Sequence, residues 1–176
     1  NSHNISIDIG ASAASAAAAM NAVLQNTGIR AEPETRVEFF DFQNNGVVTF
    51  DLEATNRLPV QISADVTPAN LANLALAINK VTADTGVSAV TSPDNSRIIL
   101  VSDAGEDIAI SNLSNTSPAF FGRMVDDDGV ALSTPVGTVS ASGNFKDILQ
   151  STNVVSDALL SGATVTTNSA AGSGAD

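Results

Sequence analysis

The stretch from Val48 to Ile110 constrains the fold most, because a helical apolar pattern is enclosed on both sides by strand-like patterns. Thr67 is the expected N-cap of this helix and Pro68 its first residue, where a missing N–H is tolerated. Gly86 supplies the expected stop. The pattern therefore predicts a helix over residues 67–80. Its apolar residues recur at the spacing of one buried helical face: Leu71, Leu74, Ala75, Ile78 and Val81.

Alternating apolar and polar residues flank this helix on both sides. Val48–Leu52 and Val60–Ala64 predict two half-buried strands joined as a hairpin. Val87–Thr91 and Arg97–Ser102 predict two more strands with a turn between them, and Ile108–Ser111 predicts a further short strand. The unit therefore has the order strand, strand, helix, strand, strand.

A weaker copy of this unit precedes it at a constant offset. An Ala-rich helix is predicted over Ser12–Gln25, between strands at Asn4–Asp8 and Arg36–Phe42. Asn45-Gly46 then predicts a hairpin turn. The copies should superpose, because two segments align in one register: Met20-Asn21 with Ile78-Asn79, and Thr27-Gly28-Ile29-Arg30-Ala31 with Thr85-Gly86-Val87-Ser88-Ala89.

These patterns predict an α+β protein of two small subdomains, each an antiparallel sheet with one packed helix. We expect residues 1–45 to be the weak copy, 46–112 the clear unit, 113–167 a variable β-rich region that packs on both, and 168–176 a flexible linker. The variable region carries weaker patterns. They predict a helical turn or buried loop at Pro118–Met124, a short helix at Phe145–Leu149 capped by Asn144, and a strand at Gly162–Thr167.

Composition excludes several classes of partner. The formal net charge is −12, and the seven Lys and Arg residues do not cluster. Nucleic acid and anionic membrane surfaces both attract basic faces, so we expect neither as a partner. The absence of Cys excludes disulfides, thiolate catalysis and Cys-ligated zinc. No segment has the apolar length of a transmembrane helix.

The sequence lacks the residue combinations that common catalytic sites require. The one histidine, His3, stands at the chain end, and no G-x-S-x-G elbow is present, so a Ser–His nucleophile is not expected. Carboxylates are plentiful, but a glycosidase cleft is usually lined by aromatic rings, and the chain has no Trp or Tyr. We therefore expect no enzyme activity, and we assign no catalytic, cofactor-binding or metal-ligating residue.

Two acidic turns and three glycosylation triplets have simpler interpretations than a binding site. Asp103–Asp107 and Asp126–Gly129 could offer oxygen ligands to calcium, but neither has the spacing of an EF-hand loop, so ordinary turns are expected. The triplets that begin at Asn4, Asn112 and Asn115 match the N-glycosylation sequon, which arises often by chance in a chain rich in Ser, Thr and Asn.

Asn21 and Asn79 occupy corresponding last turns of the two predicted helices. A side chain there can contact a partner, or it can bond to the backbone and fix the chain where the helix ends. We favour the structural interpretation.

The stretch from Val48 to Ile110 resembles the flagellin hook IN motif. The resemblance rests on Ile78-Asn79 near the helix end, on the turn and strand of Thr85–Ala89, and on the aliphatic strand Ile98–Ser102. A Gly/Asp turn and the strand Ile108-Ala109-Ile110 then follow in the order of the motif. The first copy resembles it less, because Met20 replaces Ile and the helix face is rich in Ala.

The resemblance implies a structural protein of the bacterial flagellum, namely the surface-exposed variable region of an extracellular flagellin. It also implies other flagellin subunits as partners through segments that lie outside this chain, and host or surface glycans as further contacts. The chain starts Asn1-Ser2-His3 without Met, so we expect a fragment of a longer protein. A hook-associated junction or cap protein is the first alternative, and a secreted adhesin or carbohydrate-binding module is the second.

Overall fold

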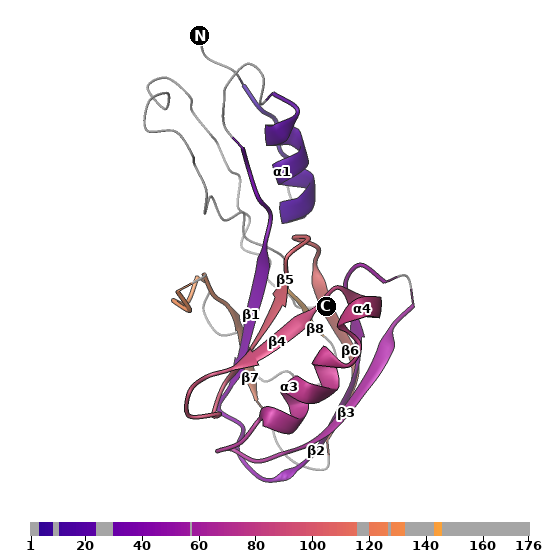
Figure 1. Ribbon diagram of the computed structural model, residues 1–176, viewed down its shortest axis with the longest axis vertical. Coiled ribbons are helices and arrows are strands. Elements are labelled where there is room, and N and C mark those ends of the chain that lie inside the picture. The colour runs from indigo at the N-terminus through magenta and orange to yellow at the C-terminus, as the bar shows by residue number, and fades with distance from the viewer. Residues whose placement is uncertain are drawn as a thin grey trace.

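The computed structural model describes residues 4–8, 11–23, 30–56, 58–115, 120–126, 128–132 and 143–145 (Figure 1). The helices in these ranges are α1 (Ala13–Asn21), α3 (Ala72–Asn79) and α4 (Thr82–Thr85). The strands in the same ranges are β1 (Thr35–Phe40), β2 (Gly46–Glu53), β3 (Val60–Val66), β4 (Ser88–Thr91), β5 (Ile98–Ser102), β6 (Ile108–Asn115), β7 (Phe121–Met124) and β8 (Gly143–Phe145).

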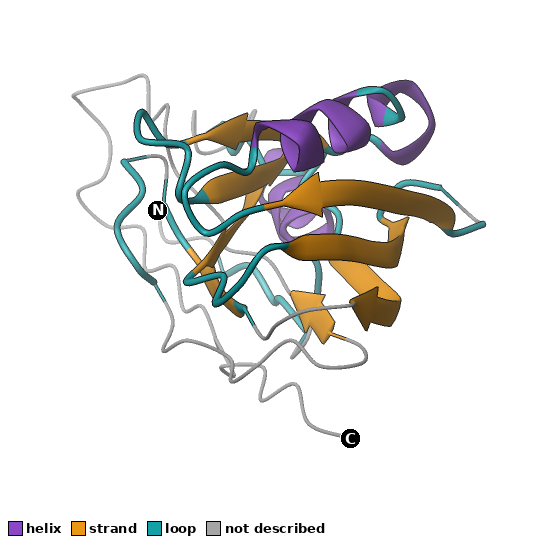
Figure 2. Ribbon diagram, turned by 90° about the horizontal axis from the view of Figure 1, so that it is seen from below, coloured by secondary structure: helices purple, strands orange, loops and turns teal. Residues whose placement is uncertain are grey.

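The strands form two antiparallel sheets, one with the order β4-β5-β1-β7 and one with the order β3-β2-β6-β8. The predicted α+β class is confirmed. Residues that alternate along β2 and β3 point alternately to the core and to solvent, as the sequence pattern requires. Helix α3 packs mainly against β3 and β4, which are edge strands of the two different sheets. It therefore covers the gap between these two sheet edges. Figure 2 shows the helices along one side of the strands.

One hydrophobic core lies between the sheets and under α3. Three Phe rings of this core contact one another: Phe39 and Phe120 have centroids 5.1 Å apart, and Phe42 stacks on Phe120 at 4.5 Å. Leu74 and Ile78 of α3 are fully buried against this cluster. Each such side chain contributes roughly 1.5–3 kcal/mol through burial. A helix as short as α3 is marginal on its own, so its packing against the core stabilises it.

The second unit has the predicted order, because β2 pairs with β3 before the helix and β4 pairs with β5 after it. The predicted helix start is wrong. Thr67 and Asn70 exchange two backbone hydrogen bonds in a tight turn around Pro68, and the helix begins at Ala72. Leu71 is the N-cap, and no side chain caps the helix there. The side-chain oxygen of Asn70, one residue earlier, accepts a hydrogen bond from the Ala72 amide at 3.0 Å.

Asn45-Gly46 does not form the predicted hairpin. The chain instead crosses here from β1 in one sheet to β2 in the other. The physical reason is that both strands are central: β1 is paired on its two edges by β5 and β7, and β2 by β3 and β6. Neither strand has an edge free to accept the other.

Two predictions in the variable region are also corrected. Pro118–Met124 was expected to be a helical turn or a loop, but Phe121–Met124 is strand β7. Its residues alternate in burial and pair with β1. Gly143–Phe145 is strand β8 on the edge of the second sheet, so Phe145 does not start a helix and Asn144 does not cap one. The predicted strand at 162–167 lies outside the described residues.

The first copy is only partly like the second. Helix α1 forms, but Asn4–Asp8 has no strand pairing, so the strand predicted there is wrong. Ala17, Met20 and Ala31 make a small separate cluster with Ile5 beside it. Figure 1 shows α1 at the far end of the long axis, beyond the sheets. The division of the chain at residues 45, 112 and 167 stays a prediction.

Candidate functional site

The end of α3 is joined to β4 by a two-point clamp. The Asn79 side chain donates to the carbonyl oxygen of Ala89 at 2.9 Å and accepts from its amide at 2.8 Å. Both bonds are partly buried, and they satisfy the backbone amide and carbonyl of Ala89 on β4, an edge strand of the first sheet. The structural interpretation of Asn79 is confirmed, with the bonds made to the following strand.

Between the two clamped residues the chain turns through α4 and Gly86. Gly86 has a φ of +72°, and a Cβ built on it would lie 2.7 Å from the side-chain oxygen of Thr55. Thr85 is fully buried, and its hydroxyl donates to the Val81 carbonyl at 3.0 Å. The Thr55 hydroxyl donates to the Thr85 carbonyl at 2.9 Å, which ties the β2–β3 hairpin to this turn. The turn at Thr85 and Gly86 is therefore a closely packed connection between the helix and the sheet.

The same clamp recurs in the first copy. The Asn21 side chain donates to the Ala31 carbonyl at 2.8 Å and accepts from the Ala31 amide at 2.9 Å. In both copies the two residues are ten positions apart. Equal spacing, equal partners and equal geometry confirm the aligned register of Asn21 with Asn79 and of Ala31 with Ala89.

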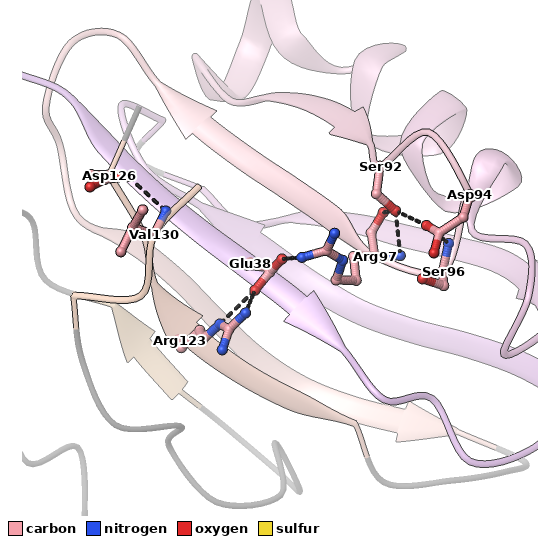
Figure 3. A network of polar contacts seen from close by, with 8 residues as sticks. All are labelled: Glu38, Ser92, Asp94, Ser96, Arg97, Arg123, Asp126 and Val130. Atoms are coloured by element: carbon pink, nitrogen blue, oxygen red, sulfur yellow. Dashed lines mark hydrogen bonds and ion pairs between the residues drawn. The ribbon is translucent and has the colours of Figure 1, made fainter. Parts of the chain in front are cut away.

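A buried carboxylate on β1 pairs with two arginines from the neighbouring strands of the first sheet (Figure 3). Glu38 on β1 is 1% exposed, and it accepts from Arg97 at 3.1 Å and from Arg123 at 2.5 Å. Arg97 precedes β5 and Arg123 lies on β7, so the three charges join neighbouring strands. The Arg123 guanidinium also lies 4.5 Å from the centroid of the Phe40 ring, which stacks on Phe121.

The turn between β4 and β5 holds a second polar cluster, also drawn in Figure 3. The Ser92 hydroxyl donates to the Asp94 carboxylate at 2.5 Å, and the Ser96 amide donates to it at 3.2 Å. These bonds, with the Ser92 bond the largest cause and the nearby Arg97 a smaller one, lower the pKa of Asp94 from 3.8 to about 2. The carboxylate thus fixes the turn and is not poised as an acid or base.

The two acidic turns are ordinary turns where the structure describes them. The Asp126 carboxylate accepts from the Val130 amide at 2.7 Å, and Gly129 donates to the Asp126 carbonyl at 3.0 Å with a φ of +77°. Gly105 turns the chain between β5 and β6. Within the described ranges, no three acidic or histidine side chains are grouped as metal ligands.

Asn112 is the best placed of the three sequon residues. It is exposed on β6 with a φ of +52°, at the point where the β2–β6 register shifts. Its side-chain nitrogen already donates to the Asp51 carboxylate at 2.7 Å. Asn4 is exposed as well, and the side chain of Asn115 lies outside the description.

No catalytic constellation is visible in the part of the chain that the structure describes. His3 lies outside it. A hollow of about 440 Å³ is open to solvent and is lined by Asn21, Arg30, Ala31, Glu32, Pro33, Glu34 and Asp103. Arg30 is paired with Glu32 at 3.0 Å, and no nucleophile stands beside a base in this lining.

Comparison with protein families identifies one segment. Residues 42–104 match the family model of the flagellin hook IN motif. This segment is therefore similar to the flagellin hook IN motif, and it is called the IN motif below. The family is a structural one, whose members assemble with other flagellin subunits into the extracellular filament. Comparison with curated proteins gives no match to the chain.

The IN motif covers just over a third of the chain, and it contains the Asn79 clamp, the Gly86 turn and both hairpins around α3. Strand β1 lies outside it, although β1 pairs with β5 of the motif in the first sheet. No helix in the described residues is both long and apolar enough to cross a membrane.

Sequence reasoning missed the Glu38 cluster. Phe39, Phe40 and Phe42 place rings on both sides of its strand, which predicts burial of both faces but assigns no partner to Glu38. The partners Arg97 and Arg123 are remote in sequence and join Glu38 only through the order β5-β1-β7. The position of Glu38 directly before Phe39 and Phe40 could have suggested that it is buried, but not which residues are its partners.

Proposed function

We propose that this chain is the outer, surface-exposed variable region of a bacterial flagellin. The observation that carries the proposal is the IN motif at residues 42–104, together with a clamp and turn that serve structure rather than chemistry. In this role the domain projects from the filament, spaces it from its surroundings, and displays a surface to them.

The described surface is compatible with such a role. The net charge of −12 favours solubility at the high local density of a filament. The IN-motif turn is held by backbone hydrogen bonds and by bonds from the Thr55 and Thr85 hydroxyls to backbone carbonyls, so the loops beside it can vary in sequence without loss of the scaffold. Adhesion and glycan attachment are finer roles that such a surface supports.

Gold-labelled antibodies against this chain, applied to intact source cells, test the proposal. Label along the whole filament is the expected result. Label confined to the hook junction or to the filament tip would instead favour the hook-associated alternative. Label on the cell body with bare filaments would overturn the flagellar assignment and favour the secreted adhesin. Filaments sheared from the cells and probed by immunoblot provide the matched biochemical control.

Glycan attachment is tested separately on protein purified from the same cells. Intact-mass measurement should give a mass above that of the bare chain, and peptide mapping should place the added sugar on an exposed Ser, Thr or Asn side chain. Protein at the unmodified mass would remove glycan display from the proposed role and leave the filament assignment untouched.

A further inference from the structure

The structure assigns a self-modification site to the crossover between the two sheets. We propose that Asn45 of the folded protein converts to a mixture of aspartate and isoaspartate, with the backbone nitrogen of Gly46 as the nucleophile and water as the only co-reactant. The proposal rests on the chemistry of this one dipeptide and is independent of the flagellar assignment.

The reaction needs a side-chain amide that is free to turn toward the next residue. In step one, the Gly46 nitrogen attacks the side-chain carbonyl carbon of Asn45 and gives up its proton. The carbon–nitrogen bond of the side-chain amide breaks, the departing nitrogen takes up that proton and leaves as ammonia, and a five-membered succinimide remains. In step two, water adds to either ring carbonyl and opens the ring. One product has an ordinary aspartate, and the other has its backbone routed through the former side chain.

Asn45 alone among the described asparagines combines a side chain without a hydrogen bond and a glycine as the next residue. Most of the others are held by side-chain hydrogen bonds: Asn21, Asn56, Asn70, Asn79, Asn95 and Asn112. Asn45 is exposed and has no hydrogen bond from its side chain within the described chain. It is also the only asparagine in the sequence that is followed by glycine. Glycine has no Cβ to hinder the attack and resists the required backbone rotation least.

The surrounding backbone leaves room for the reaction. Gly46 is the first residue of β2 and lies opposite Val66 at the end of the ladder, where strand pairing opens most easily. The φ of Gly46 lies outside the left-handed region, so the turn does not require a glycine at this position. By contrast, Gly129, which follows Asp128, is held by its amide hydrogen bond to Asp126.

The products change the crossover in two ways. Each adds one negative charge to a chain whose formal net charge is already −12. The isoaspartate form also inserts an extra backbone carbon directly before β2. The buried residues Val48 and Phe50 anchor the register of β2 beyond that point, so we expect the change to stay within the loop and the first rung of the ladder.

Peptide mapping of the whole chain, aged in mildly alkaline buffer at body temperature, tests the proposal. The expected result is a gain of one mass unit on the peptide that contains Asn45, with isoaspartate in it detected by enzymatic methylation. Incubation in heavy-oxygen water should place one heavy oxygen in that product. Asn73, which is exposed in α3 and followed by Leu74, serves as the internal control and should stay intact.

Two variants separate the mechanism from general ageing. Gly46→Ala should slow the conversion by at least about tenfold, because the added Cβ hinders the attack at Asn45. Asn45→Gln should abolish it, because the longer side chain forms the corresponding ring poorly. The proposal is overturned if folded wild-type protein keeps Asn45 intact for the time in which urea-unfolded protein converts. That outcome would mean that the Gly46–Val66 rung holds the backbone away from attack.

Discussion

Asn79 and Ala89 are joined by two hydrogen bonds of 2.9 and 2.8 Å, and Asn21 and Ala31 repeat this arrangement at 2.8 and 2.9 Å. A side chain that satisfies both the donor and the acceptor of one residue acts like a strand added to that edge. It lets a helix end and a strand edge meet without a buried backbone group left unpaired.

Removal of this clamp should cost stability. Asn79→Ala leaves the Ala89 amide and carbonyl without their partners, and we expect a loss of about 1–3 kcal/mol in the free energy of unfolding. Urea denaturation followed by circular dichroism measures it. Asn73→Ala is the matched control on the same helix: Asn73 is exposed, and Ala is the better helix former, so that variant should be unchanged or slightly more stable.

Asn79→Asp tests whether both bonds matter, since a carboxylate keeps the acceptor and loses the donor. It should destabilise less than Asn79→Ala at acidic pH, where the protonated acid can donate again, and the difference should shrink as the pH rises. If the wild type and both variants have equal free energies of unfolding, the two Asn79 bonds do not stabilise the fold.

Gly86 combines a left-handed backbone with a close approach, and the two costs can be separated. Gly86→Ala should lose about 1–2 kcal/mol from its positive φ alone, plus a further cost from the contact of the new Cβ with Thr55. Gly129→Ala is the matched control, because its φ of +77° is similar and nothing lies within 4 Å of a Cβ there. The difference in thermal midpoint between the two variants measures the clash.

The Glu38 cluster should contribute through Arg123 more than through Arg97. The Arg123 side chain is 23% exposed and also contacts the Phe40 ring, whereas Arg97 is 46% exposed. Breaking a buried ion pair costs about 3–5 kcal/mol, and the partial exposure of these arginines should reduce the loss in Glu38→Ala to about 2 kcal/mol. Double-mutant cycles with each arginine test the order, and a larger coupling to Arg97 would contradict it.

Asp94 sets a pH window for the β4–β5 turn. Because its pKa in the folded protein is lowered from 3.8 to about 2, its contribution to stability is present above pH 3.8 and is lost as the pH falls toward 2. A carbon-detected NMR titration should give a midpoint near 2, and Ser92→Ala should move this midpoint back toward 3.8. A midpoint unchanged by that substitution would show that the Ser92 bond is not the main cause.

Local patterns predicted most of the elements, because strand alternation and helical spacing are properties of neighbouring residues. The β2–β3 hairpin and the helix face of Leu74 and Ile78 came from such patterns. The predicted stop at Gly86 was wrong for α3, which ends at Asn79, because Gly86 ends the separate short helix α4. Helix boundaries were less accurate, since the backbone bonds between Thr67 and Asn70 close a turn around Pro68 and delay the helix start to Ala72.

The sequence by itself determined the repeat, the α+β class and the IN motif, because each depends on the order and spacing of residues along the chain. Only the tertiary structure decided how the strands share two sheets. β1 lies between β5 and β7, so Asn45-Gly46 became a crossover instead of a hairpin, and Glu38 met Arg97 and Arg123. Strand pairing of this kind depends on which edges remain unpaired and on how the apolar faces pack. No short stretch of sequence determines either of these.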